Sequence, residues 1–304
     1  MLYAAVDIGG TSIKYGIINK EGVVLFRYET PTEAHKGGEK LMEKVIHLVE
    51  TLWHKSGPLV GIGISTAGQV NVQAGSIEFA TDTLPGWTGM PVASILEERF
   101  QIPVAVENDV NAAALGEAWK GAGEGVKDFL CLTIGTGIGG AIVTNGQIYH
   151  GSTGSAGEFG HIRLERNGKA CTCGQLGCFE QYASTSALVK EAQLRLKQDG
   201  RPTKELDGRQ IFEQAKLGQE VFVSLIEDWT GDIALGLASL CHIFNPSLIV
   251  LGGGVSKQGA FLSDKLEQKL GNLLMPSFRK NLKIAMATCG NEAGMLGAVS
   301  LLVK

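Results

Sequence analysis

The stretch F-L-C-L-T-I-G-T-G-I-G-G-A-I-V-T-N-G-Q-I-Y-H, residues 129–150, decides the expected fold. An apolar run, a glycine loop over 135–140 and a second apolar run predict a strand, a tight loop and a returning strand. Asn145-Gly146 is a strong signal for a two-residue hairpin turn, so a third strand is expected over 147–150. The order is strand, glycine loop, strand, turn and strand.

The same order occurs a second time at the beginning of the chain. Strands are expected over 3–8, 13–19 and 23–29, and the motif D-I-G-G-T (7–11) forms the first turn. A chain of 304 residues is too long for one small core. The repeated order therefore predicts two related α/β domains that arose by duplication.

The rest of the chain alternates helices with buried strands, apart from an irregular segment that ends near residue 90. We expect the first domain to cover 1–117 plus about 291–304, the second, larger domain to cover 118–290, and a hinge near 117–127. The remaining helices are expected around 41–52, 91–100, 110–119, 183–198, 207–217, 220–244, from about 260 and over 292–302, and the remaining strands over 59–65, 102–107, 247–251 and 283–287.

Composition excludes several classes of protein. The net charge is −4, whereas a nucleic-acid-binding protein is expected to have a basic face. The N-terminal residues lack the charged and apolar regions of a signal peptide, and no apolar run reaches the length of a membrane span. We therefore expect a cytoplasmic protein that binds neither nucleic acid nor membrane.

A cluster of cysteines predicts a zinc site. The motif C-T-C-G-Q-L-G-C-F-E (171–180) holds three of the six cysteines, and G-E-F-G-H (157–161) precedes it. Three thiolates and one imidazole form a four-coordinate site that is closed and therefore structural. The expected ligands are His161, Cys171, Cys173 and Cys178. The alternatives are three ordinary buried cysteines or a disulfide, and a reducing compartment disfavours the disulfide.

Three glycine-rich loops could bind phosphate groups through their backbone N–H groups, namely 9–11, 135–140 and 252–254. The loop 135–140 formally matches the dinucleotide fingerprint, but that motif requires a following helix and here a strand follows. No P-loop motif is present in the sequence. The alternative is three tight turns without a ligand. Asp7 precedes the first loop and could hold Mg²⁺ directly or through water.

The residues Glu107-Asn108-Asp109 mark the end of a strand and the start of a helix. A carboxylate at Asp109 could act as the general base of phosphoryl transfer to an alcohol. The alternative role of Asp109 is a helix N-cap. Glu158 and Glu180 flank the expected zinc site and could accept hydrogen bonds from sugar hydroxyls, or could be ordinary surface charges. His161 could serve the metal with one ring nitrogen and the sugar with the other.

Together these residues resemble the ROK family (repressors, open reading frames and kinases), bacterial sugar kinases of the actin/hexokinase-like superfamily. The matching motifs cover nearly the whole chain: D-I-G-G-T (7–11), S-T-A-G-Q-V (65–70), V-E-N-D-V-N-A-A-A-L-G-E (106–117), T-I-G-T-G-I-G-G (133–140), A-G-E-F-G-H-I (156–162), C-T-C-G-Q-L-G-C-F-E (171–180) and V-L-G-G-G-V (250–255). The resemblance implies an α/β fold of two actin/hexokinase-like, ribonuclease H-like domains with a cleft between them.

The resemblance also implies a role for each matching residue. Asp109 corresponds to the catalytic base. The implied sugar contacts are Gly68, Asn108, Asp109, Glu158, His161 and Glu180. The implied nucleotide contacts are Asp7, Gly9, Gly10, Thr11, Thr133, Gly135, Thr136, Gly137, Gly253 and Gly254. The zinc ligands are the four named above, and the cofactors are ATP, Mg²⁺ and a structural Zn²⁺.

The implied activity is ATP-dependent transfer of the γ-phosphoryl group to the 6-hydroxyl of a hexose by a homodimeric enzyme. Glucose or a β-glucoside is the expected acceptor, with N-acetylmannosamine and fructose as alternatives. Family glucokinases carry an Asn where T-L-P-G-W (83–87) has Thr83, which leaves the sugar open. The family also contains repressors with a helix-turn-helix segment before the first phosphate loop. Only six residues precede Asp7, so a kinase is expected rather than a repressor or a non-catalytic sugar sensor.

Overall fold

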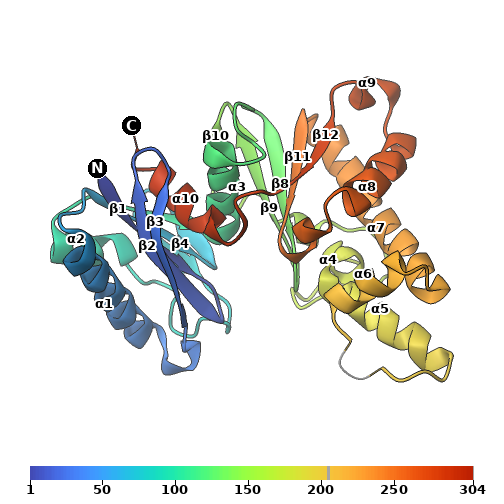
Figure 1. Ribbon diagram of the computed structural model, residues 1–304, viewed down its shortest axis with the longest axis horizontal. Helices are drawn as coiled ribbons and strands as arrows, with labels where there is room; N and C mark the ends of the chain where they lie inside the picture. The colour runs from blue at the N-terminus through green and yellow to red at the C-terminus, as the bar shows by residue number, and fades with distance from the viewer. Residues whose placement is uncertain (204–205, 304) are drawn as a thin grey trace. The chain divides into compact units, whose positions relative to one another are not determined.

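The computed structural model describes residues 1–203 and 206–303 and divides into two compact units (Figure 1). The first unit comprises Met1–Lys127, Ala141–Ala156 and Thr288–Lys304, and the second comprises Asp128–Gly140 and Gly157–Ala287. The segment 141–156 therefore groups with the N-terminal unit, whereas the sequence analysis assigned it to the larger domain.

The first unit is built on a five-stranded mixed sheet. Strands β1, β4 and β7 are parallel, and β2 and β3 continue the sheet antiparallel to β1. The strand order is β3 (Val24–Pro31), β2 (Ser12–Asn19), β1 (Leu2–Ile8), β4 (Gly61–Thr66) and β7 (Val104–Asn108). The parallel arrangement brings the carboxyl ends of three strands to one edge of the sheet.

Helices cover both faces of this sheet. Successive side chains of a strand point to opposite faces, so alternate residues of β1 pack against different helices. Ala4 and Val6 of β1 pack in a cluster with α1 and α2, whereas Tyr3 and Ala5 pack with Met295 on α10. The helices of this unit are α1 (Gly38–Ser56), α2 (Val92–Phe100), α3 (Asp109–Lys120) and α10 (Ala293–Ser300), with the short 3-10 helices η1 (Ala34–Lys36) and η4 (Gly290–Glu292). The C-terminal helix α10 thus groups with the first unit.

Glycines allow the backbone of α10 to pack directly against the backbone of its neighbours. A Cβ atom on Gly297 would lie 1.7 Å from the carbonyl oxygen of Ala112 in α3. On Gly63 of β4 it would lie 2.6 Å from the carbonyl carbon of Ala298. No side chain fits at either position, so these glycines allow α10 to pack against both β4 and α3.

The second sheet follows the order β10, β9, β8, β11 and β12, and the boundary between the two units falls within β9. Strand β11 is parallel to both β8 and β12. The strands are β8 (Phe129–Ile134), β9 (Ile138–Thr144), β10 (Gln147–Ile148), β11 (Leu248–Gly252) and β12 (Lys283–Met286). The strand, glycine loop, strand, turn and strand that the sequence predicted therefore occurs once in each of the two five-stranded sheets.

The helices of the second unit are mostly as expected. One difference is at Ser184, whose hydroxyl accepts a hydrogen bond from Ala187 N–H and so begins a new helix. The helices are α4 (Glu180–Ala183), α5 (Thr185–Gln198), α6 (Gly208–Lys216), α7 (Glu220–Phe244), α8 (Ala260–Leu273) and α9 (Pro276–Arg279), with the 3-10 helices η2 (Phe159–His161) and η3 (Gly254–Gln258). None of the helices in the described ranges has the length and apolar character needed to span a membrane.

The segment expected to be irregular contains a small hairpin in the first unit. Strand β5 (Gln69–Asn71) pairs with β6 (Ser76–Phe79) in antiparallel fashion. Gly75 adopts a positive φ of 62° at its turn. Strands of three and four residues are too short to produce a recognisable alternation, which is why the sequence pattern missed them.

Candidate functional site

Three polar side chains lie in one row at the carboxyl ends of the parallel strands of the first sheet. Asp7 on β1 pairs in register with Ser65 on β4, which in turn pairs with Glu107 on β7. Asn108 follows as the last residue of β7. Ligands of open α/β sheets bind outside the carboxyl ends of the strands, so this row marks the functional edge of the first unit.

Asp7 is held in a fixed orientation by two neighbours. Ser65 Oγ donates to Asp7 Oδ1 over 2.6 Å, and Lys14 Nζ donates to Asp7 Oδ2 over 3.4 Å. The ammonium group of Lys14 compensates part of the carboxylate charge. Ser65 and Lys14 were not singled out from the sequence as site residues, although Ser65 begins the motif S-T-A-G-Q-V and Lys14 lies three residues after D-I-G-G-T.

The first glycine loop is closed by backbone hydrogen bonds. Gly9 N–H donates to Ser12 O over 3.0 Å, and Thr32 N–H donates to Thr11 O over 2.9 Å. Thr32 Oγ1 also donates to Gly9 O over 2.6 Å. Gly10 and Thr11 remain exposed at the tip. The loop is therefore rigid at its base, with the predicted phosphate contacts at its surface.

Asn108, and not Asp109, is the N-cap of α3. Asn108 Oδ1 accepts hydrogen bonds from Val110 N–H over 2.9 Å and from Asn111 N–H over 3.1 Å. Asp109 is the first helical residue, so the alternative that it serves as the N-cap is not what the structure shows. Asn108 Nδ2 also donates to Gly68 O over 2.9 Å, which brings two of the predicted sugar contacts together.

The Asp109 carboxylate has an unusually high pKa. Burial, and after it the negative charge of Asp7, raise the pKa of Asp109 to about 6, against hydrogen bonds from Val110 N–H and Asn108 Nδ2 that favour the charged form. Both of these bonds end on Oδ1. A carboxylate with a pKa of about 6 is suited to take a proton from an alcohol near neutral pH.

Glu107 is a buried residue beside the candidate base, and the sequence analysis gave it no role. Its side chain is buried, and it accepts hydrogen bonds from the N–H of Asn108, from the side chain of Asn111 and from the ring of His150. The hydrogen bond to Glu107 raises the pKa of His150. Glu107 could have been found from its place beside Asn108-Asp109, but its partner His150 lies 43 residues away in the sequence.

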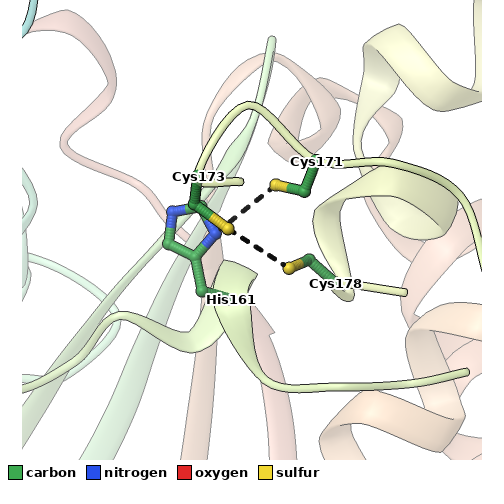
Figure 2. A group of neighbouring side chains, drawn as sticks. All are labelled: His161, Cys171, Cys173 and Cys178. Carbon is green, nitrogen blue, oxygen red and sulfur yellow. Dashed lines mark hydrogen bonds between the residues drawn. The ribbon is translucent and has the colours of Figure 1, made fainter. Parts of the chain in front are cut away.

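The four predicted zinc ligands meet at one point of the second unit (Figure 2). All four ligand atoms lie within 4.8 Å of one another; Cys171 Sγ is 3.7 Å from His161 Nδ1, and Cys173 Sγ is 3.6 Å from Cys178 Sγ. A tetrahedral zinc with Zn–S bonds of about 2.3 Å requires ligand atoms about 3.8 Å apart. Both the donor set and its dimensions therefore fit a structural zinc ion.

The backbone of this cluster is folded back on itself by glycines. Gly174 and Gly177 have positive φ angles of 84° and 74°. A Cβ atom on Gly177 would lie 1.6 Å from the carbonyl oxygen of Glu165, so no other residue fits there. Burial raises the pKa of the Cys178 thiol to about 12, and a bound cation would reverse that shift because it favours the thiolate.

The cluster is continuous with the second glycine loop. A Cβ atom on Gly137 would lie 2.7 Å from Glu180 Oε2, and Glu180 Oε1 lies 3.3 Å from Cys171 Sγ. On the other side, a Cβ atom on Gly160 would lie 2.3 Å from Ile138 O. The second unit thus places a predicted sugar contact, Glu180, between the metal site and the predicted phosphate loop. Glu158 and His161 are exposed in the same region.

The other predicted nucleotide contacts lie at the carboxyl ends of β8 and β11. Thr133 pairs in register with Gly252, and a Cβ atom on Gly253 would lie 2.4 Å from Ile134 O. Gly253 has a φ of 80°, which favours glycine. Added Cβ atoms at Gly135 and Gly254 would meet nothing in the described part of the chain within 4 Å. These two loops therefore present open backbone at adjacent strand ends.

Known proteins are similar to this chain along its whole length. A family model described as ROK family matches residues 3–304. The chain is 36% identical over 310 residues to a glucokinase of Halalkalibacterium halodurans, covering 97% of this chain and 93% of that one. It is 35% identical over 300 residues to a beta-glucoside kinase of Listeria innocua, covering 98% and 96%. A xylose repressor of Caldicellulosiruptor bescii is 28% identical over 98% of this chain and 77% of its own length.

A solved structure matches the fold as well. The crystal structure of a ROK family glucokinase from Streptomyces griseus, in complex with glucose and AMPPNP, superposes with a TM-score of 0.84 at 34% identity and covers 99% of both chains. This match confirms the expected fold class of two actin/hexokinase-like α/β domains.

Proposed function

The chain belongs to the ROK family, and from this premise we propose that it is an ATP-dependent sugar kinase. The reaction is transfer of the γ-phosphoryl group of ATP to the 6-hydroxyl group of a hexose, with glucose or a β-glucoside as the acceptor. Relatives named glucokinase and beta-glucoside kinase, both about a third identical to this chain, support that choice.

The observation that carries the proposal is the state of Asp109. This carboxylate begins α3, its Oδ1 is held by Asn108 Nδ2 and by Val110 N–H, and its pKa is raised to about 6. Phosphoryl transfer to an alcohol uses a carboxylate base that orients the acceptor hydroxyl and takes its proton as the bond to phosphorus forms. Asp109 has the protonation behaviour and the fixed position that this role requires.

The nucleotide is assigned to the backbone of the glycine loops. Gly9, Gly10 and Thr11 present a rigid turn in the first unit, and the open backbone of the loops around Gly135 and Gly254 serves the same purpose in the second. The carboxylate of Asp7 suits Mg²⁺, which prefers oxygen ligands and keeps several waters. When bound, Mg²⁺ would neutralise charge on the phosphates. Lys14 and Ser65 keep the Asp7 carboxylate oriented for that contact.

The acceptor sugar is assigned to polar side chains from both units. Asn108 and Gly68 are joined by a hydrogen bond in the first unit, and Glu158, His161 and Glu180 surround the predicted zinc site in the second. Pairs of neighbouring hydroxyls are recognised by carboxylates, which accept hydrogen bonds from both. His161, Cys171, Cys173 and Cys178 would hold the zinc, and the metal would supply rigidity to this set of side chains.

The identity of the sugar depends on small differences among the residues near the proposed contacts. Thr83 lies beside the first glycine loop, where a Cβ atom on Gly10 would be 3.6 Å from Thr83 Cβ, and its hydroxyl is 2.8 Å from that of Thr81. A threonine there has a shorter reach than an asparagine. N-acetylmannosamine and fructose therefore stay as alternative acceptors.

A repressor is the alternative from another functional class, since a xylose repressor is among the relatives. A purely sugar-binding protein does not need a general base, whereas Asp109 has the properties of one. We therefore favour the kinase.

An ATP-coupled assay over a panel of acceptors tests the proposal. The panel contains glucose, cellobiose, other β-glucosides, N-acetylmannosamine and fructose, each with ATP and Mg²⁺. We expect turnover with glucose or a β-glucoside and a product phosphorylated at the 6-hydroxyl. Absence of turnover with every sugar, together with measurable sugar binding by calorimetry, would instead identify a sensor.

A further inference from the structure

Glu107 is a buried carboxylate that carries no role in the proposed reaction so far. It is the last but one residue of β7, two residues before Asp109, and it is 0% exposed. A carboxylate is costly to bury unless hydrogen bonds satisfy its oxygens. Its retention next to the proposed catalytic base therefore calls for a physical reason.

One oxygen of Glu107 closes the first turn of α3. Glu107 Oε1 accepts from Asn108 N–H over 2.9 Å and from Asn111 Nδ2 over 3.0 Å. The two donors lie on either side of Asp109 in the chain. Asn108 Oδ1 caps the same turn through the N–H groups of Val110 and Asn111. The backbone that carries Asp109 is therefore tied to Glu107 from both sides.

The other oxygen joins this turn to a distant segment. Glu107 Oε2 lies 2.8 Å from Nε2 of His150, which follows β10 and belongs to the same unit. The hydrogen bond to Glu107 raises the pKa of His150, so the imidazole ring stays protonated to higher pH than the ring of a free histidine. His150 O accepts from Ala156 N–H over 3.1 Å, which closes the loop 150–156.

We propose that Glu107 is a positioning residue for phosphoryl transfer: it fixes the first turn of α3, and with it Asp109, against the His150 segment. This inference rests on the proposed function. Glu107 does not touch the substrate in this scheme. It acts through Asp109, because general-base catalysis depends on the placement of the base relative to the acceptor hydroxyl.

The test is Glu107→Gln, with Glu117→Gln as the matched control. Glutamine keeps the volume but replaces one acceptor oxygen with an NH2 donor and removes the charge, so it cannot accept hydrogen bonds from both the α3 turn and a protonated His150. Glu117 lies near the end of α3, is 1% exposed and also uses both oxygens, which accept from Cys289 N–H, Thr288 N–H and Ala122 N–H. Its partners lie in the loop after α3 and the C-terminal segment, away from the α3 N-terminus.

We expect Glu107→Gln to lower kcat by about 10- to 100-fold with KM for sugar and ATP changed by less than about 3-fold. Glu117→Gln should lower the melting temperature but leave kcat within roughly 2-fold of wild type. Combined with Asp109→Asn, Glu107→Gln should cause no further loss of kcat, because both act on the same step. His150→Ala should also reduce kcat. His150→Gln keeps a hydrogen-bond donor for Glu107 and should therefore retain more activity than His150→Ala.

Hydrogen exchange provides a readout that does not depend on activity. Amides 109–112 at the α3 N-terminus should exchange faster in Glu107→Gln, and in His150→Ala if the first variant does not fold, but not in Glu117→Gln. Equal kcat in Glu107→Gln and wild type, additive losses with Asp109→Asn, or unchanged exchange at the α3 turn would overturn the inference. An inactive wild-type protein with faster exchange in Glu107→Gln would refute the proposed kinase and leave Glu107 as the anchor of that turn.

Discussion

Asn108 donates a hydrogen bond from Nδ2 to Oδ1 of Asp109 over 3.0 Å, and its own Oδ1 caps the helix that Asp109 begins. The two residues therefore have different roles at the α3 N-terminus. Asn108 satisfies the backbone, which leaves the carboxylate of Asp109 available for chemistry. The capping role could have been given to either residue on the sequence alone.

The first prediction concerns Asn108→Ala. Loss of the N-cap should lower the free energy of unfolding by about 1 kcal/mol, and loss of the proposed sugar contact should raise KM for the sugar. Ser184→Ala is the control, because Ser184 caps α5 through Ala187 N–H and should cost similar stability with normal kinetics. Thermal unfolding and steady-state kinetics provide both measurements. A normal sugar KM in Asn108→Ala would contradict its assignment to the sugar.

The second prediction is that Asp109→Asn loses activity but gains stability. Without a general base, kcat should fall by about 10²- to 10⁴-fold, while calorimetry should still detect sugar and ATP binding. The pKa of Asp109 is raised from 3.8 to about 6, so the buried charge costs at most about 3 kcal/mol, and partial solvent exposure reduces this to about 1–2 kcal/mol at pH 7. Near-normal turnover in this variant would refute the assignment of the base.

The pH dependence of that stability difference has a definite sign. Because the pKa of Asp109 is higher in the folded protein than its ordinary value of 3.8, folding favours the protonated form. The cost of the charge is therefore fully present above pH 6 and disappears below pH 4. Unfolding experiments at pH 7.5 and pH 4 should show Asp109→Asn more stable than wild type only at the higher pH. An equal difference at both values would point to altered packing instead.

The third prediction is the acid limb of the activity profile. The proposed base must be deprotonated to act, so kcat/KM should fall tenfold per pH unit below a midpoint near 6. The residual activity of Asp109→Asn should lack this acid limb, so the variant is the control for the wild-type profile. A wild-type profile that stays flat down to pH 5 would show that Asp109 does not titrate in the free enzyme as the structure implies.

Much of the fold follows from local sequence pattern, and most of what was missed depends on contacts between distant residues. The apolar residues Leu41, Val45, Leu48 and Leu52 repeat at helical spacing, and the structure buries all of them on α1. The membership of the ROK family followed from motifs spread over the chain and is confirmed. By contrast, the pairing of Glu107 with His150 joins residues 43 positions apart, and no periodicity signals such a bond. The β5–β6 hairpin was missed because its strands are too short to alternate.

The candidate site divides in the same way. The cysteine cluster could be predicted from spacing and glycine content, since its ligands are close in sequence and the turns between them require glycine. The role of Ser65 could not, because its bond to Asp7 spans 58 residues and depends on the register of β1 against β4. Strand register is set by the whole sheet and not by either strand alone.

The fourth prediction compares two helical glycines. In Gly297→Ala the new Cβ would lie 1.7 Å from the carbonyl oxygen of Ala112, so α10 must move away from α3 and the protein should lose about 2–4 kcal/mol of stability. Gly231 lies inside α7, and a Cβ there meets nothing in the described ranges within 4 Å. Gly231→Ala should therefore add about 0.5–1 kcal/mol through helix propensity. Denaturant unfolding of both variants measures the pair, and effects of the same sign would contradict the packing.

The fifth prediction concerns the metal. Purified protein should contain about one zinc per chain, and Cys178→Ser should lose it, because a structural site needs all four ligands. The loss should lower the melting temperature and weaken sugar binding more than ATP binding, since Glu180 lies 3.3 Å from Cys171 Sγ. Cys241→Ala on α7 is the control, as this buried cysteine lies outside the cluster and should keep both zinc and sugar affinity. Elemental analysis tests the zinc content, and calorimetry tests sugar binding. Full sugar affinity in a zinc-free variant would refute the link between the metal and sugar binding, but it would not contradict the metal site.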